Sequence, residues 1–201
     1  GMYDHIGGGF SRYSVDEMWL VPHFEKMLYD QALLVRVYLH AGMLFGNETW
    51  KQVARETIEY VLRDLTHRDG GFFSAEDADS LDDSGHSHEG HFYVWSRDEI
   101  INALPAHLHE AALTWYEITV PGNFEGKNIP ARLHHRGALS RPPEVEEARQ
   151  LLYQHRESRK RPLLDDKVLT EWNAMMLATL AEAAFFFESD EWLQAAIRNG
   201  E

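Results

Sequence analysis

The sequence predicts a mainly α-helical protein, part of an α/α toroid of about three helical hairpins with a β-hairpin inserted between them. Two long segments, residues 22–41 and 173–187, are apolar nearly all round, which is typical of buried helices. Two others, residues 49–65 and 143–159, carry one apolar stripe with charges opposite, which is typical of surface helices. Buried and amphipathic helices that alternate along a chain indicate an inner and an outer layer, as in a toroid.

Composition limits the classes of function that the chain can serve. A length of 201 residues suits a single domain, residues 1–201, and a hydrophobic share of 44% predicts a packed core. The net charge of −14 argues against a nucleic-acid partner or an anionic membrane surface. The absence of cysteine excludes disulfides and thiolate zinc sites, and no apolar run is long enough to span a membrane. We therefore expect a cytoplasmic protein with no membrane partner.

The first buried helix is predicted to begin at Pro22 and to end before Gly42. Proline suits the first helical position because its missing N–H would be unpaired there, and glycine suits the residue that follows a helix. Two aromatic runs, "GFFSA" and "HFYVW", then flank a polar loop and predict a long β-hairpin. A third inner helix is expected from about Arg97, a further helix over residues 106–118 and a loop over residues 119–137.

The ends of the chain and the approaches to its inner helices are also informative. The chain opens within a glycine-rich motif, and its last segment, "DEWLQAAIRNGE", is typical of a helix that has just begun. We therefore expect a piece of a larger protein. Segments rich in polar and aromatic residues lead into the inner helices before Pro22, Ser96 and Asn173. In a layer of parallel inner helices, these three segments would meet at one rim.

Several motifs together resemble one family of thioredoxin-domain-containing proteins, which includes spermatogenesis-associated members and has no established function. They are the opening "GGGFSRYSVDEMWLVPHFEKMLYDQALL", "GGFFSAEDADS", "EGHFYVW", "FEGKNI" and "DDKVLTEWNA", which occur in order between Gly1 and Phe187. The resemblance implies a thioredoxin-like domain followed by a six-hairpin α/α toroid of the kind shared with sugar 2-epimerases and glycosidases. By this resemblance we expect residues 1–201 to lack the thioredoxin-like part and to supply about three hairpins of the toroid. The resemblance supplies no settled catalytic residues.

The first candidate cluster lies where the helix from Pro22 is predicted to begin. On that helix His23 and Asp30 would share a face, with Glu25 and Tyr29 on the neighbouring one. Acid, base and hydrogen-bonding groups placed together in this way suit proton transfer on a small polar molecule. A structural alternative is a salt-bridged helix entrance in which Arg12 neutralises Asp30 or Glu25.

Two further clusters contain paired carboxylates. The segment "SAEDADS" offers Glu76, Asp77 and Asp79, which could perform glycoside chemistry if their spacing fits. It fails as a calcium loop because Leu81 occupies an acidic position. A structural loop that binds its own amides is an equal alternative. The segment "LLDDKVLTEWNA" offers Asp165 and Asp166 as acid or base groups and Asn173 as a hydrogen-bonding group, with helix capping as the alternative.

Aromatic residues and histidines complete the candidates. Trp19, Trp95 and Trp172 each stand ahead of an inner helix, where a flat ring suits a sugar, although each could equally pack in the core. The segment "HSHEGH" supplies His86, His88, Glu89 and His91, a possible metal-ligand set. The favoured prediction includes no metal and no cofactor.

These observations lead to one favoured function and one alternative. The favoured function is a carbohydrate-binding or carbohydrate-converting toroid fragment of the epimerase or glycosidase type. Its proton-transfer groups would be His23, Glu25, Asp30, Glu76, Asp77, Asp79, Asp165 and Asp166, and its sugar-binding groups Arg12, Tyr13, Trp19, Tyr29, Trp95, Trp172 and Asn173. The alternative is a non-catalytic scaffold that binds a partner or presents a thioredoxin-like domain. Because half a toroid would expose apolar inner helices, we also expect a homodimer.

Overall fold

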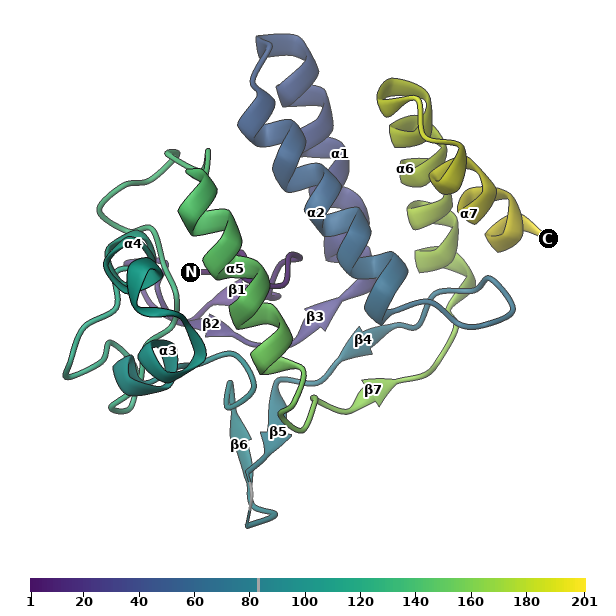
Figure 1. Cartoon of the computed structure of the whole chain (residues 1–201). Helices are drawn as coiled ribbons and strands as arrows, with labels where there is room; N and C mark the ends of the chain where they lie inside the picture. Colours follow the sequence, from purple (N-terminus) through teal and green to yellow (C-terminus); the bar gives the residue numbers. More distant parts are fainter. Residues whose placement is uncertain (83) are drawn as a thin grey trace. The chain divides into compact units, whose positions relative to one another are not determined.

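The computed structural model describes residues 1–82 and 84–201 and is mainly α-helical (Figure 1). The chain divides into two compact units. The first comprises residues 1–7, 11–24 and 78–163, and the second comprises residues 8–10, 25–77 and 164–201. Within the described residues no helix is long and apolar enough to cross a membrane.

The second unit contains two helical hairpins. Helix α1 (Leu28–Phe45) packs against α2 (Glu48–Asp64), and α6 (Thr170–Phe187) packs against α7 (Asp190–Gly200) (Figure 1). As predicted, α2 carries one apolar stripe whereas α1 and α6 are apolar on most sides, and α7 is amphipathic as well. The core between them includes Leu39, Ile58 and Leu180, each fully buried.

Helices α1 and α6 run parallel to each other. The hydroxyl of Thr179 donates to the carbonyl of Ala32 at 3.0 Å, and Arg36 Nε donates to Glu182 at 3.0 Å. Both contacts join residues that are offset by nearly the same number of positions, which requires the same direction. The second unit therefore places α1 and α6 side by side, and each is followed by a helix that packs against it, α2 and α7 respectively.

The predicted start of the first helix at Pro22 is wrong. Pro22–His23 forms strand β2, Lys26–Met27 forms strand β3, and the helix begins at Leu28. The amide of Leu28 donates to the carbonyl of Ser74, so strand pairing holds the backbone extended up to that residue. His23 and Glu25 therefore do not lie on the helix that carries Asp30.

The predicted end at Gly42 is also wrong, because α1 continues to Phe45 and Gly46 adopts the left-handed conformation. Gly42 lies inside the helix, where a Cβ would lie 2.7 Å from Lys51 Cγ on α2. The glycine therefore permits close helix packing instead of ending the helix.

Three short strands link the helices of the second unit. β3, β4 (Ala75–Glu76) and β7 (Leu164–Asp165) form an antiparallel sheet in which Lys26 lies opposite Glu76 and Ala75 opposite Asp165. The segments that precede α1 and α6 therefore lie on either side of β4, as expected for two of the three segments that lead into inner helices. The segment before α3 (Arg97–Ala103) belongs to the first unit.

The first unit is built from short elements. β1 (Tyr13–Ser14) pairs with β2, and β5 (Asp79–Leu81) pairs with β6 (Ser87–Glu89). After α3 come a 3₁₀ turn (Ala106–Leu108), α4 (His109–Trp115) and α5 (Pro143–Arg156). The predicted helical region of residues 106–118 and the loop that follows it are confirmed in outline. A capping box between Ser96 and Glu99 fixes the start of α3 where it was expected.

The predicted pairing of "GFFSA" with "HFYVW" is wrong, since the hairpin lies between them, at β5 and β6. Its polar loop includes Asp83, which lies outside the described residues. The amides of Tyr93 and Val94 both donate to the carbonyl of Gly90, so the second aromatic run folds into a turn. The alternating pattern reflects burial of Phe92, Tyr93 and Val94 in a small core and not an extended strand.

Candidate functional site

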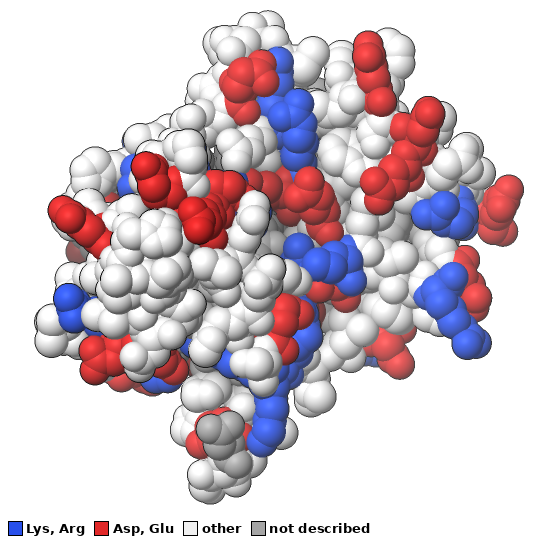
Figure 2. Space-filling model, viewed as in Figure 1, with Lys and Arg blue, Asp and Glu red and all other residues white. Residues whose placement is uncertain are grey.

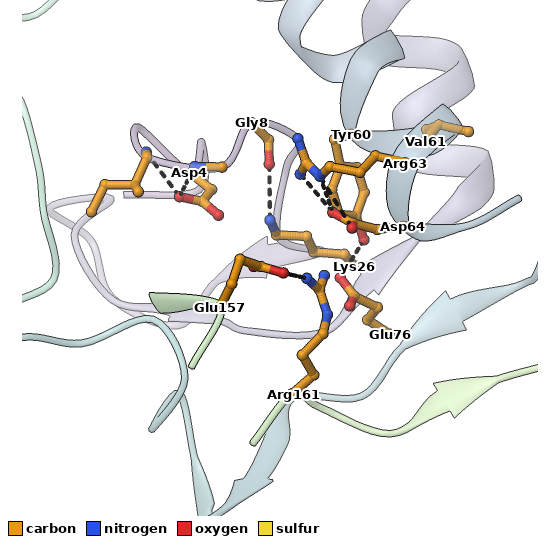
Figure 3. A network of polar contacts seen from close by, with 12 residues as sticks. Asp4, Gly8, Lys26, Tyr60, Val61, Arg63, Asp64, Glu76, Glu157 and Arg161 are labelled. Atoms are coloured by element: carbon orange, nitrogen blue, oxygen red, sulfur yellow. Dashed lines mark hydrogen bonds and ion pairs between the residues drawn. The ribbon is translucent and has the colours of Figure 1, made fainter. Parts of the chain in front are cut away.

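In the second unit, Glu76 belongs to a buried polar network with Lys26 and Tyr60 (Figure 3). The Tyr60 hydroxyl donates to Glu76 Oε2 at 2.7 Å, and Lys26 Nζ donates to the carbonyl of Gly8 at 2.9 Å and lies 4.4 Å from the centroid of the Tyr60 ring. Buried charges of this kind are tolerated only when they are paired and hydrogen-bonded. In this structure Glu76 therefore holds elements of the second unit together.

Asn173 is likewise engaged by the fold. Its side-chain oxygen accepts from the amide of Phe72 at 2.7 Å, and its nitrogen donates to the carbonyls of Phe72 and Leu169, each at 3.0 Å. Asn199 donates to the same oxygen at 2.8 Å. These hydrogen bonds satisfy the side-chain amide of Asn173, as burial of a polar group requires. The amide therefore has little remaining capacity to bind a sugar.

The other predicted residues of the second unit are more accessible. Asp165 is half-buried and accepts from Lys167 Nζ at 2.8 Å, and this hydrogen bond lowers the pKa of Asp165. Tyr29 and Trp172 are half-buried, with ring centroids 4.9 Å apart in an edge-to-face contact. The remaining predicted site residues of the second unit range from half-buried to exposed: Glu25, Asp30, Asp77 and Asp166.

The three tryptophans do not share one environment. Trp95 is fully buried in the core of the first unit, with Arg159 Cζ 3.9 Å from its ring centroid, so its face is closed to a ligand. Trp172 packs against the core of the second unit. Trp19 is 61% exposed. Their similar places in the sequence do not make them one sugar-binding platform in this structure, because burial differs at each.

The first unit brings His23 together with Glu89, which was not among the predicted proton-transfer or sugar-binding groups. His23 Nδ1 lies 2.7 Å from Glu89 Oε1, and the two side chains are 27% and 46% exposed. The ring of Tyr13 stacks on the imidazole with centroids 5.0 Å apart. The signal for Glu89 was present, since it falls in the motif "EGHFYVW", but its partner lies 66 positions away in the sequence. Asp79 lies opposite Glu89 in the β5–β6 pair.

Gly90 fixes the backbone immediately after Glu89. It has φ +73°, and a Cβ at this position would lie 2.4 Å from the ring of Phe24. Its amide donates to the carbonyl of Ala78. Only glycine satisfies both the left-handed conformation and this close contact, so Gly90 positions Glu89 beside His23, the neighbour of Phe24.

Glu89 also lines a cleft of about 160 Å³ in the same unit. The other lining residues are Asp82, His88, His91, Val94, Phe124, Glu125 and Lys127. Asp82 is held by His88 Nε2 at 3.1 Å, and Lys127 Nζ lies 3.4 Å from Glu99. Carboxylates, imidazoles, an ammonium group and one aromatic ring therefore surround a space that suits a small polar molecule, below the usual 300–1,000 Å³ of drug-sized sites.

A metal centre receives no support from the residues that the structure describes. Among them, no three His, Asp or Glu side chains are grouped as a metal ion would require. His86 and His88 both face Asp82, with nitrogen–oxygen distances of 3.8 and 3.1 Å.

The charged side chains are mixed in sign on the surface. Figure 2 shows acidic and basic side chains interspersed on one face of the molecule.

Comparison with known proteins identifies relatives of the whole chain. No family model matches it. A human protein is 37% identical over 228 residues, covering 98% of this chain. That human protein is spermatogenesis-associated protein 20, and this chain is a relative of it. The mouse protein of that name is 38% identical over 90% of the chain, and an uncharacterized protein of Caenorhabditis elegans is 32% identical over 98%. The chain spans less than a third of these relatives, 29%, 27% and 31% respectively. The name of spermatogenesis-associated protein 20 agrees with the type that the motifs predicted.

Proposed function

We propose that this chain binds a small carbohydrate in the cleft that Glu89 lines and converts it by proton transfer. The observation that carries this proposal is the 2.7 Å contact between His23 and Glu89, two partly exposed groups that can exchange a proton. A stacked Tyr13 ring and the Phe124 ring in the cleft wall offer the flat apolar surfaces that sugar rings favour. Asp79, on the strand that pairs with β6, would be a further acidic group near the site.

A larger assembly is the second part of the proposal. Parallel α1 and α6, each followed by an outer helix, support an (α/α)6 toroid of which residues 1–201 would form one fragment. Toroids of this architecture occur among sugar-converting enzymes, which supports a carbohydrate ligand by analogy of fold.

Binding of saccharides tests the proposal directly. In ligand-observed NMR of the chain with D-glucose, D-mannose, N-acetyl-D-glucosamine and maltose, we expect saturation transfer to at least one sugar. Glu89→Gln and His23→Gln should weaken that binding by about tenfold, because each removes a charge-assisted hydrogen bond worth about 1.5 kcal/mol or more. Glu191→Gln, at an exposed position in the second unit, is the matched control and should bind as the unchanged chain does. The absence of transfer to every sugar would reject the proposal.

A non-catalytic role in partner binding is the second candidate, and a separate surface favours it. Leu33, Val37 and Leu44 lie on one face of α1, and Phe185 lies on α6; the four side chains are between 50% and 78% exposed. Helices α1 and α6 therefore each leave apolar side chains uncovered in the single chain. Exposed apolar groups of this size tend to find a partner, and a second copy of the chain would bury both faces.

The oligomeric state decides this second candidate. At micromolar concentration we expect sedimentation as a homodimer, and Val37→Lys should shift the chain to monomer because it places a charge in the apolar face. Lys51→Ala, on α2, is the control and should leave the dimer intact. A monomer for the unchanged chain at these concentrations would eliminate the homodimer.

A further inference from the structure

A second pocket of the first unit, of about 420 Å³, shares no lining residue with the cleft beside Glu89. Its volume falls within the usual 300–1,000 Å³ of small-molecule sites, whereas that of the cleft falls below this range. Helix α4, the loop between α4 and α5, and the start of α5 surround the pocket. Its wall combines apolar side chains with one guanidinium and two carboxylates: Ala111, Trp115, Val145, Arg132, Glu110 and Glu144.

Arg132 is the buried charge in this wall. It is 9% exposed, and its Cζ lies 3.6 Å from the centroid of the Trp115 ring. Nε and Nη2 donate to the carbonyl of Ala138 at 3.2 and 2.8 Å, and Nη1 donates to the carbonyl of Trp115 at 2.9 Å. A guanidinium has five N–H groups, and these bonds use three of them. The other two, one on each terminal nitrogen, have no acceptor among residues 1–82 and 84–201.

The positive charge of Arg132 is not balanced by an ion pair. In the described part of the chain, no Asp or Glu oxygen lies within 4 Å of its guanidinium nitrogens. The carboxylate of Glu117 instead accepts the amides of Leu133 and His134, each at 2.9 Å. Burial lowers the pKa of Arg132, and the charge of Glu117 offsets only part of this effect. Because a buried cation without an anion is unfavourable, an anionic ligand would stabilise this site.

The other charges of the pocket favour an anion with a single negative charge. Glu110 and Glu144 are exposed and would repel a phosphate dianion, which one guanidinium cannot balance. A carboxylate matches the charge of Arg132 and can accept two N–H groups from it. We propose that this pocket binds a small organic monocarboxylate, with its carboxylate on Arg132 and its apolar body beside Trp115 and Val145. This inference does not depend on the carbohydrate function.

Titration with simple carboxylates tests the proposal. Benzoate, phenylacetate and hexanoate are added to the chain at millimolar concentration, and binding is followed by ligand-observed NMR. We expect at least one of them to bind at least about tenfold more tightly than its uncharged amide, which cannot form charge-assisted hydrogen bonds. Inorganic phosphate should bind more weakly than that carboxylate. No binding of any carboxylate, equal binding of the amide, or tighter binding of phosphate would each overturn the proposal.

Charge substitutions show whether the pocket selects anions. Glu144→Gln removes a negative charge from the wall, so it should tighten binding of the carboxylate by about two- to threefold. A site for cations would respond in the opposite direction, which would contradict the proposal. Arg132→Gln should weaken binding by at least about tenfold.

A blocking substitution keeps the test valid if Arg132→Gln fails to fold, since that variant also loses its hydrogen bonds to two carbonyls. Thr114→Phe places a ring in the pocket from an exposed position on α4 and leaves Arg132 unchanged, so it should abolish binding. Gln154→Phe, at an exposed position of α5 that does not line the pocket, is the matched control and should bind as the unchanged chain does. Carboxylate binding that survives Thr114→Phe would place the ligand elsewhere and overturn the inference.

Discussion

Replacing Arg156 with alanine is expected to lower the free energy of unfolding by about 3–5 kcal/mol. Arg156 is 3% exposed and donates from both terminal nitrogens to Asp4, at 3.0 and 2.9 Å. The same carboxylate accepts the amides of Ile6 and Gly7, each at 3.0 Å, so it also fixes the turn that follows. Without the guanidinium, a buried carboxylate would keep its charge with no cation to balance it.

Urea unfolding followed by circular dichroism measures this effect, and two variants calibrate it. Arg156→Lys retains the charge but cannot form both bonds, so its loss should be smaller than that of Arg156→Ala. Arg68→Ala is the surface control, because the Arg68 side chain is 88% exposed and its ion pair with Asp69 spans 3.8 Å. Surface pairs of this kind contribute at most about 1 kcal/mol. A loss for Arg156→Ala no greater than that of Arg68→Ala would contradict the structural role.

Acid is expected to destabilise the protein through His5. Burial lowers the pKa of His5 from 6.5 to about 3. Above pH 6.5 the imidazole is neutral in both the folded and the unfolded chain, so its contribution to the free energy of unfolding does not depend on pH there. Between pH 6.5 and 3 the unfolded chain binds a proton that the folded chain does not, so stability falls as the pH falls, by about 1.4 kcal/mol per unit.

Measuring the free energy of unfolding at two pH values, in the unchanged chain and in His5→Gln, isolates the contribution of His5. From pH 7.5 to pH 5, His5 should account for a loss of about 2 kcal/mol in the free energy of unfolding. His5→Gln carries no titrating group, so its urea midpoint should fall less than that of the unchanged chain over this interval. The other ionisable groups are common to both chains and cancel in the difference. Equal falls in the two chains would show that His5 is protonated in the folded state.

The sequence by itself determined the helical content and the hairpin order. Segments with apolar residues on nearly every side became α1 and α6, and segments with one apolar stripe became α2 and α5, because periodicity reports directly which faces can be buried. These features depend on neighbours that are close in the sequence.

Only the tertiary structure decided where the helices begin and which polar groups are available for chemistry. Pro22 suited a helix start, but pairing of β3 with β4, about fifty positions away, held the backbone extended up to Leu28. Glu76 was predicted as a proton-transfer group and Asn173 as a sugar-binding group, and both are engaged by buried hydrogen bonds. Glu89 instead meets His23 at 2.7 Å. Residue type and spacing record what a side chain could do. Burial and partners decide what it does, and both depend on segments that are remote in the sequence.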